Sequence, residues 1–96
     1  MLILITYDVA TSSEGGARRL RKVAKECVNY GHRVQNSVFE CNLDSAQFVY
    51  LQHLLEQIID KKQDSLRFYN LGKKGFSKVT HIGVEAPYDS ETRCIL

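Results

Sequence analysis

The feature that most constrains this chain is a short apolar run at its start. Residues 2–5 read Leu-Ile-Leu-Ile, and Thr6, Tyr7 and Asp8 follow before a loop rich in Gly and Ser. A strand with one face in water would alternate apolar and polar residues, so this run predicts a strand buried on both faces. It is far shorter than the roughly 20 residues that span a bilayer, and no basic leader precedes it. We therefore expect no membrane segment and a cytoplasmic protein.

Hydrophobic periodicity beyond this strand predicts two helices and four further strands. The first helix has Leu20, Ala24, Cys27 and Val28 on its apolar face, and Gly31 is its expected stop signal. The second opens with a capping box, in which Asp44 is the N-cap and Gln47 the third helical residue. The predicted helices are residues 17–30 and 45–60, and the predicted strands are residues 2–8, 32–35, 37–43, 65–71 and 78–84.

This element order predicts an α+β, ferredoxin-like βαββαβ sandwich with an extra C-terminal strand. The 96 residues suit one domain, which we place at residues 1–84. The tail, residues 85–96, is expected to be loosely held or docked on a partner. Two helices would cover one sheet face, and the apolar run requires a cover on the other. A twofold homodimer is the simplest such cover.

Basic residues gather in the first predicted helix. The formal net charge is only +2, so composition by itself does not indicate a nucleic-acid-binding protein. Only Glu14 and Glu26 lie close enough to balance the helical cluster. A solvated helix face explains many such runs, but a dimer would double the cluster into a positive surface suited to phosphates. The cluster comprises Arg18, Arg19, Arg21, Lys22 and Lys25, and a second basic group contains Lys73, Lys74 and Lys78.

Asp8 is the best candidate for a metal ligand. It stands where a central strand ends, at the rim of the sheet. One carboxylate is a poor magnesium site, but a twofold dimer would supply two, and magnesium commonly uses one or two carboxylates with phosphate oxygens and waters. The competing interpretation is that Asp8 only starts the turn by accepting local N–H bonds.

Cysteine and histidine spacing points to no other site. Cys27, Cys41 and Cys94 form no closely spaced pair, which argues against a disulfide framework or a zinc site. Cys27 and Cys41 are expected to be small buried residues. The three histidines are scattered, which favours structural roles for each.

Four stretches together resemble a known family. They are Tyr-Asp-Val at 7–9, Tyr-Gly-His-Arg-Val-Gln at 30–35, Ser-Val-Phe-Glu at 37–40 and Asp-Ser-Leu-Arg-Phe-Tyr at 64–69. In this order and spacing, with a basic helix between the first two, they closely resemble the Cas-two family, the smaller of the two CRISPR adaptation proteins. The resemblance covers about residues 1–84.

The resemblance implies a homodimer that cleaves DNA or RNA phosphodiesters with a divalent metal, Mg²⁺ or Mn²⁺, centred on Asp8. It also implies that Tyr7, Arg18, Arg19, Arg33 and Phe39 support the site. A complex with the larger adaptation integrase is implied too, in which the chain acts mainly as a DNA-holding scaffold. A weaker third interpretation is a small-molecule-sensing regulator, for which residues 15–16, Gly-Gly, offer the only hint.

Overall fold

The computed structural model describes residues 1–10, 12–72 and 78–84, and within them the chain forms two helices and one antiparallel sheet. The sheet order is β2-β3-β1-β4-β5. This confirms the predicted α+β class and element order. The elements are β1 (Leu2–Asp8), α1 (Gly16–Cys27), β2 (Gly31–Gln35), β3 (Val38–Asn42), α2 (Ser45–Ile58), β4 (Ser65–Asn70) and β5 (Lys78–Gly83).

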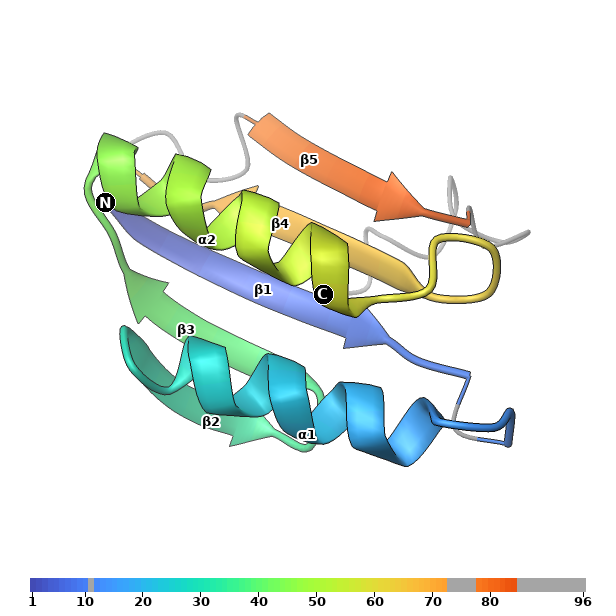
Figure 1. Ribbon diagram of the computed structural model, residues 1–96. Coiled ribbons are helices and arrows are strands. Elements are labelled where there is room, and N and C mark those ends of the chain that lie inside the picture. Colours follow the sequence, from blue (N-terminus) through green and yellow to red (C-terminus); the bar gives the residue numbers. More distant parts are fainter. Residues whose placement is uncertain (11, 73–77, 85–96) are drawn as a thin grey trace.

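Both helices lie on the same face of the sheet, and β1 runs through its centre (Figure 1). Side chains on β1 alternate, so Ile3, Ile5 and Tyr7 point into the layer between sheet and helices and are buried. Helix α2 covers β4 through an edge-to-face contact between Phe48 and Phe68, whose ring centroids are 5.6 Å apart. The core is therefore one layer between the helices and one sheet face.

Helix α1 ends three residues earlier than its apolar pattern predicts. Cys27 is its last residue, and Val28 is a C-cap in right-handed geometry with 47% of its surface exposed. Gly31 is not the stop signal. It begins β2, where a Cβ would overlap the Glu40 carbonyl on β3. The requirement for glycine there comes from the close approach of two strands, which the helical pattern did not indicate.

Helix α2 begins as predicted. Asp44 Oδ1 accepts from the Gln47 backbone N–H at 2.7 Å, and Gln47 Oε1 accepts from the Asp44 N–H at 3.0 Å. These reciprocal bonds satisfy two donors at the helix start. The helix ends at Ile58, two residues before the predicted end.

The strands agree with the predictions in number and, to within a residue or two, in position. Phe39 and Cys41 on β3 share the buried face, as the period of two required. Tyr69 on β4 departs from the pattern. It shares a strand face with Arg67, two residues earlier, yet only 6% of it is exposed. In β4 both faces are therefore partly covered.

The sheet face away from the helices is less covered at β1. Leu2 and Leu4 point to this face, which we call the open face, where Leu2 is 40% exposed and Leu4 is half-buried. In the single chain β1 is thus fully covered on one face only, and the homodimer expected to cover the other face stays a prediction. Neither α1 nor α2 has the length and apolarity that crossing a membrane requires. The expected tail at 85–96, Cys94, Lys73 and Lys74 lie outside the described residues.

Candidate functional site

Asp8 is the last residue of β1 and its side chain is exposed. Because side chains alternate along a strand, Tyr7 enters the core while Asp8 points to the open face. Asp8 lies directly opposite Ser65, the first residue of β4. Within the described ranges, its carboxylate makes no hydrogen bond or ion pair. The competing interpretation, in which Asp8 merely caps a turn, predicts such bonds, so the geometry favours a carboxylate that is available to a ligand.

A second carboxylate, which the sequence analysis missed, organises the chain around Asp8. Asp64 is fully buried and accepts hydrogen bonds from two side chains. Tyr7 Oη donates at 2.5 Å, and Arg19 donates in bidentate fashion, from Nε at 2.7 Å and from Nη2 at 3.1 Å. The backbone N–H groups of Ala10 and Asp60 donate to the same carboxylate at 3.1 and 3.0 Å. We call Asp64 and these donors the Asp64 hub.

The charges of the Asp64 hub are mutually stabilised. Burial by itself would raise the pKa of Asp64, but the Arg19 guanidinium, the Tyr7 hydroxyl and two backbone N–H groups outweigh it, so the net pKa is below the ordinary value. Burial first, and then the hydrogen bond to Asp64, raise the pKa of Tyr7. The bond to Asp64 likewise raises the pKa of Arg19. The hub therefore holds an anion, a cation and a neutral phenol at neutral pH.

The Asp64 hub holds the residues next to Asp8, both along the chain and across the strand pair. It binds the side chain of Tyr7, which precedes Asp8, and the backbone of Ala10, two residues after it. Ser65, the strand partner of Asp8, directly follows Asp64. The hub thus fixes where β1 ends and how the loop leaves it. The only sequence signal for this role was that Asp64 opens one of the stretches that carry the family resemblance.

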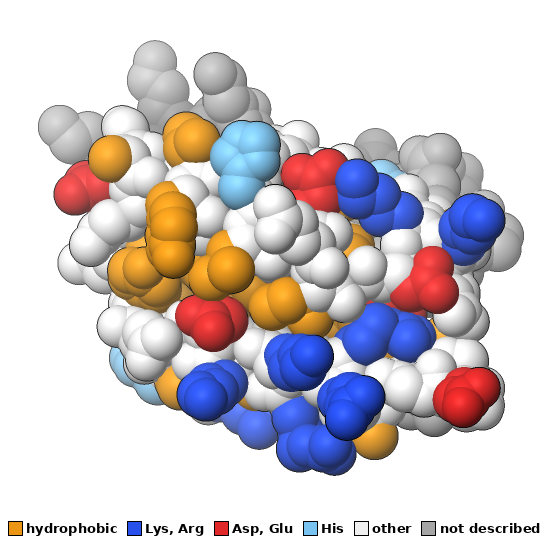
Figure 2. All heavy atoms as spheres, viewed as in Figure 1, with side chains coloured by type: hydrophobic (Ala, Val, Ile, Leu, Met, Phe, Trp, Pro, Cys, Tyr) orange, Lys and Arg blue, Asp and Glu red, His pale blue; other side chains and the backbone are white. Residues whose placement is uncertain are grey.

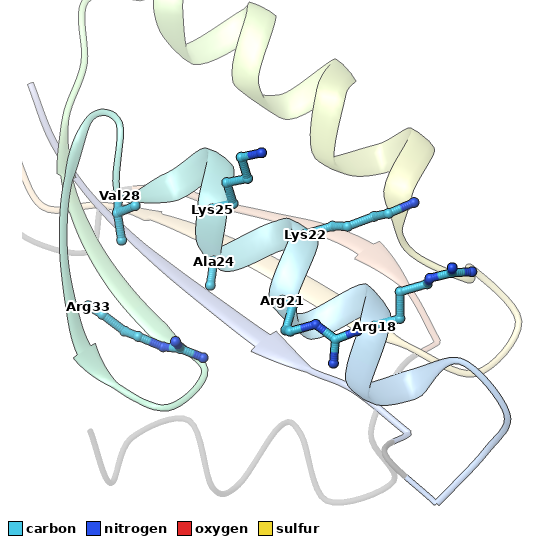
Figure 3. A pocket seen from close by; sticks show the side chains of 7 residues that line it. All are labelled: Arg18, Arg21, Lys22, Ala24, Lys25, Val28 and Arg33. Carbon is cyan, nitrogen blue, oxygen red and sulfur yellow. The ribbon is translucent and has the colours of Figure 1, made fainter.

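The basic residues of α1 form a separate feature on the helix-covered side (Figure 2). They line an open groove of about 570 Å³ between α1 and β2, which we call the α1–β2 groove (Figure 3). Arg33 contributes from β2 and is held in place, because its Nε donates to the Asn36 carbonyl at 2.7 Å and its guanidinium lies 5.6 Å from the Phe39 ring centroid. The lining residues are Arg18, Arg21, Lys22, Ala24, Lys25, Val28 and Arg33.

The structure does not bring the six residues predicted for the site into one place. Arg18 and Arg33 line the α1–β2 groove, with Phe39 fully buried beneath Arg33. The Tyr7 and Arg19 side chains belong to the Asp64 hub. Asp8 alone points to the open face. The two glycines behind the regulator interpretation start α1, and Gly15 supplies the positive φ of 82° at its N-cap.

The described residues of one chain do not assemble a complete metal site. Among the described residues, no three His, Cys, Asp or Glu side chains cluster as metal ligands. The Asp8 carboxylate and the Ser65 hydroxyl opposite it are oxygen donors, the type that Mg²⁺ and Mn²⁺ prefer. The donor set fits a metal that takes one or two carboxylates and completes its shell with water and phosphate oxygens.

A family model described as "CRISPR associated protein Cas2" matches residues 1–79. The chain belongs to the Cas2 family. It is 59% identical over 91 residues to the CRISPR-associated endonuclease Cas2 of Halalkalibacterium halodurans, covering 95% of each chain. It is 54% identical over 96 residues to the CRISPR-associated endoribonuclease Cas2 of Chlorobaculum tepidum, covering 100% of both. The resemblance to Cas-two is thereby confirmed.

Two solved structures support the same fold. A crystal structure of Streptococcus pyogenes Cas2 at pH 6.5 matches with a TM-score of 0.73 and 62% identity, over 76% of this chain and 88% of that one. A hypothetical protein of Thermus thermophilus, TT1823, matches with a TM-score of 0.58 and 27% identity, over 88% and 82% of the two chains.

The Asp64 hub makes a testable prediction about stability. Asp64→Asn removes the negative charge that compensates Arg19 and points amide hydrogens at existing donors. Breaking a buried ion pair on one side costs about 3–5 kcal/mol, so we expect a fall in the free energy of unfolding of about 3 kcal/mol. Urea denaturation measures this, and Asp44→Asn is the control because Asn also serves as an N-cap. A loss below about 1 kcal/mol would contradict the hub's role.

The same substitution should change how the free energy of unfolding depends on pH in the acid range. Because the pKa of Asp64 is lower in the folded state than its unfolded value of about 3.9, its contribution is complete above that pH. It is lost as pH falls through the folded pKa. The parent should therefore lose stability below about pH 4, and Asp64→Asn should show a shallower dependence there.

Proposed function

We propose that this Cas2 protein is a divalent-metal-dependent nuclease that acts as a homodimer on nucleic acid during CRISPR spacer acquisition, with Asp8 as the metal-binding and catalytic residue. The observation that carries the proposal is an exposed Asp8 carboxylate, without a partner among the described residues, at the end of a strand that the Asp64 hub holds in place. The names of relatives, endonuclease and endoribonuclease, support phosphodiester cleavage. We expect it to act in the cytoplasm.

Asp8 would hold Mg²⁺, or Mn²⁺, together with the Asp8 of a second copy. Such an ion neutralises charge on the phosphate oxygens and lowers the pKa of water. The chain's own residues orient the site: Tyr7 and the Ala10 N–H keep Asp8 in place through Asp64. The α1–β2 groove would contribute electrostatic attraction for the phosphate backbone.

The proposed homodimer would form through the open face. Leu2 on β1 and Val79 on β5 are 40% and 49% exposed there, and Leu4 is half-buried between them. Around a twofold axis, this apolar patch of one chain packs against the same patch of the second chain. It would also bring the Asp8 carboxylates of two chains to one site, whereas the described residues of a single chain form no cluster of metal ligands.

The second candidate function is a non-catalytic scaffold that holds protospacer DNA for the larger adaptation integrase. The observation that favours it is the position of the α1–β2 groove. The groove lies on the helix-covered side, whereas Asp8 points to the opposite face. Nucleic acid bound along α1 is therefore bound by residues other than the one proposed to cleave.

The dimer is tested by light scattering at micromolar concentration. The parent should have twice the mass of the chain. Leu4→Glu puts a charge into the open face, between Glu40 on β3 and Tyr69 on β4, and should give a folded monomer. Val49→Glu on the exposed surface of α2 is the control and should remain dimeric. A monomeric parent would rule out the two-carboxylate site.

The nuclease proposal is tested with Asp8→Asn. Asn keeps the size and most hydrogen bonding but loses the charge that holds a cation, so metal-dependent plasmid nicking should fall to background. Folding and dimerisation should persist, because Asp8 is exposed and lies outside the core. Full activity in this variant would move the site elsewhere. No nicking by the parent with any divalent metal would leave the scaffold as the better candidate.

The role of the α1–β2 groove is tested by salt dependence. Each phosphate contact adds about 0.9 to the slope of log affinity against log salt for duplex DNA. Replacing Lys22 and Lys25 together with Ala should flatten that slope by about 2 per chain. The matched control replaces Lys61 and Lys62, which are exposed in the turn before β4 and outside the groove. Equal slopes for both double variants would show that the groove is only a solvated helix face.

A further inference from the structure

Arg67 is the only Lys or Arg in β3, β1 and β4, the three central strands, all of which lie within the described residues. Its chain neighbours Leu66 and Phe68 are buried on the face that the helices cover. Because side chains alternate along a strand, Arg67 points to the open face, as Asp8 does. One cation of the central strands therefore lies on the same face as the carboxylate proposed to bind the metal.

The strand register places Arg67 one diagonal step from Asp8. Asp8 pairs with Ser65, and Thr6 pairs with Arg67, so Arg67 is two residues along β4 from the strand partner of Asp8. Diagonal neighbours of this kind lie about 7–8 Å apart, which long side chains can span. The Asp8 carboxylate forms no ion pair within the described ranges, so the two charges are close without being bonded to each other. A phosphate group can bridge them, since its oxygens bind both a metal ion and a guanidinium.

The cations of the α1–β2 groove and of the Asp64 hub cannot take this place. The groove lies on the helix-covered side, whereas Asp8 points to the open face. The Arg19 guanidinium binds Asp64 through Nε and Nη2. Two facing Asp8 carboxylates would repel a phosphate, and the metal alone must offset that repulsion unless a protein cation assists. Arg67 is the basic residue of the central strands that lies close enough to assist.

We infer that Arg67 binds a non-bridging oxygen of the nucleic-acid phosphate held at Asp8; this rests on the proposed nuclease function. Guanidinium groups bind phosphate through a planar fork of N–H donors. One arginine side chain carries five such donors, so Arg67 can hold a phosphate oxygen together with another partner. Arg67 is half-buried, and at such a position water screens the attraction between guanidinium and phosphate less than it does at a fully exposed one.

Arg67→Gln tests the contact, because Gln keeps N–H donors but loses the charge. With Ca²⁺ in place of Mg²⁺, the affinity for a short duplex DNA should fall about 10- to 100-fold, the scale of one hydrogen bond to a charged group. The slope of log affinity against log salt should flatten by about 0.9 per chain. In plasmid nicking, KM should rise by a similar factor while kcat stays near the parent value, because the bound substrate already makes the contact. Lys62→Gln removes an exposed cation outside the groove and is the matched control, which should bind as the parent does.

A second variant separates phosphate binding from a structural role. Arg67→Lys keeps the charge but not the planar fork, so it should recover part of the affinity, and both variants should remain dimeric with the parent urea midpoint. Parent affinity and parent KM in Arg67→Gln, with an inactive Asp8→Asn, would overturn the role of Arg67 and leave the proposed function intact. Loss of the dimer or a lower urea midpoint in both variants would overturn it as well, by assigning Arg67 to the contact between copies. A parent that nicks DNA with none of the divalent metals would overturn both the proposed function and this inference.

Discussion

The ion pair between Asp64 and Arg19 is the interaction on which the geometry of this small protein depends. Burying a carboxylate without partners is expensive, yet Asp64 is fully buried and receives five hydrogen bonds from four residues. Those donors come from β1, the loop after it, α1 and the turn before β4. A single carboxylate thus joins the start of α1 to the ends of the two central strands.

Replacing such a pair with apolar residues is often neutral or stabilising in other proteins, so stability is a weak explanation for its presence. The position of the Asp64–Arg19 pair next to Asp8 offers a better explanation. The Asp8 side chain is exposed and makes no hydrogen bond or ion pair among the described residues, so neighbouring residues must hold its position. The Asp64 hub does this through Tyr7, Ala10 and the chain position of Ser65. Tyr7 and Arg19 therefore contribute through Asp64 as positioning residues.

The alternation of side chains along β1 separates the two surfaces for which we propose a function. Tyr7 and Asp8 are adjacent in sequence but point to opposite faces of the sheet, one to the helices and one to the open face. The cations of α1 and Arg33 lie on the helical side. In our proposals, holding nucleic acid and cleaving it therefore fall to different residues. The nuclease and scaffold proposals differ in which surface matters in the cell, and both use the same fold.

By itself, the sequence determined the elements, their order, the capping box at Asp44, the exposed basic face of α1 and the family resemblance. These follow from periodicity and short-range chemistry, which are local in the chain. Only the tertiary structure revealed that Asp64 binds Tyr7 and Arg19, which are 57 and 45 residues away. It also placed Gly31 against β3 and His81 against Ser65. The physical reason is the same in each case: the partners meet only when the sheet pairs, and the spacing along the chain contains no record of that pairing.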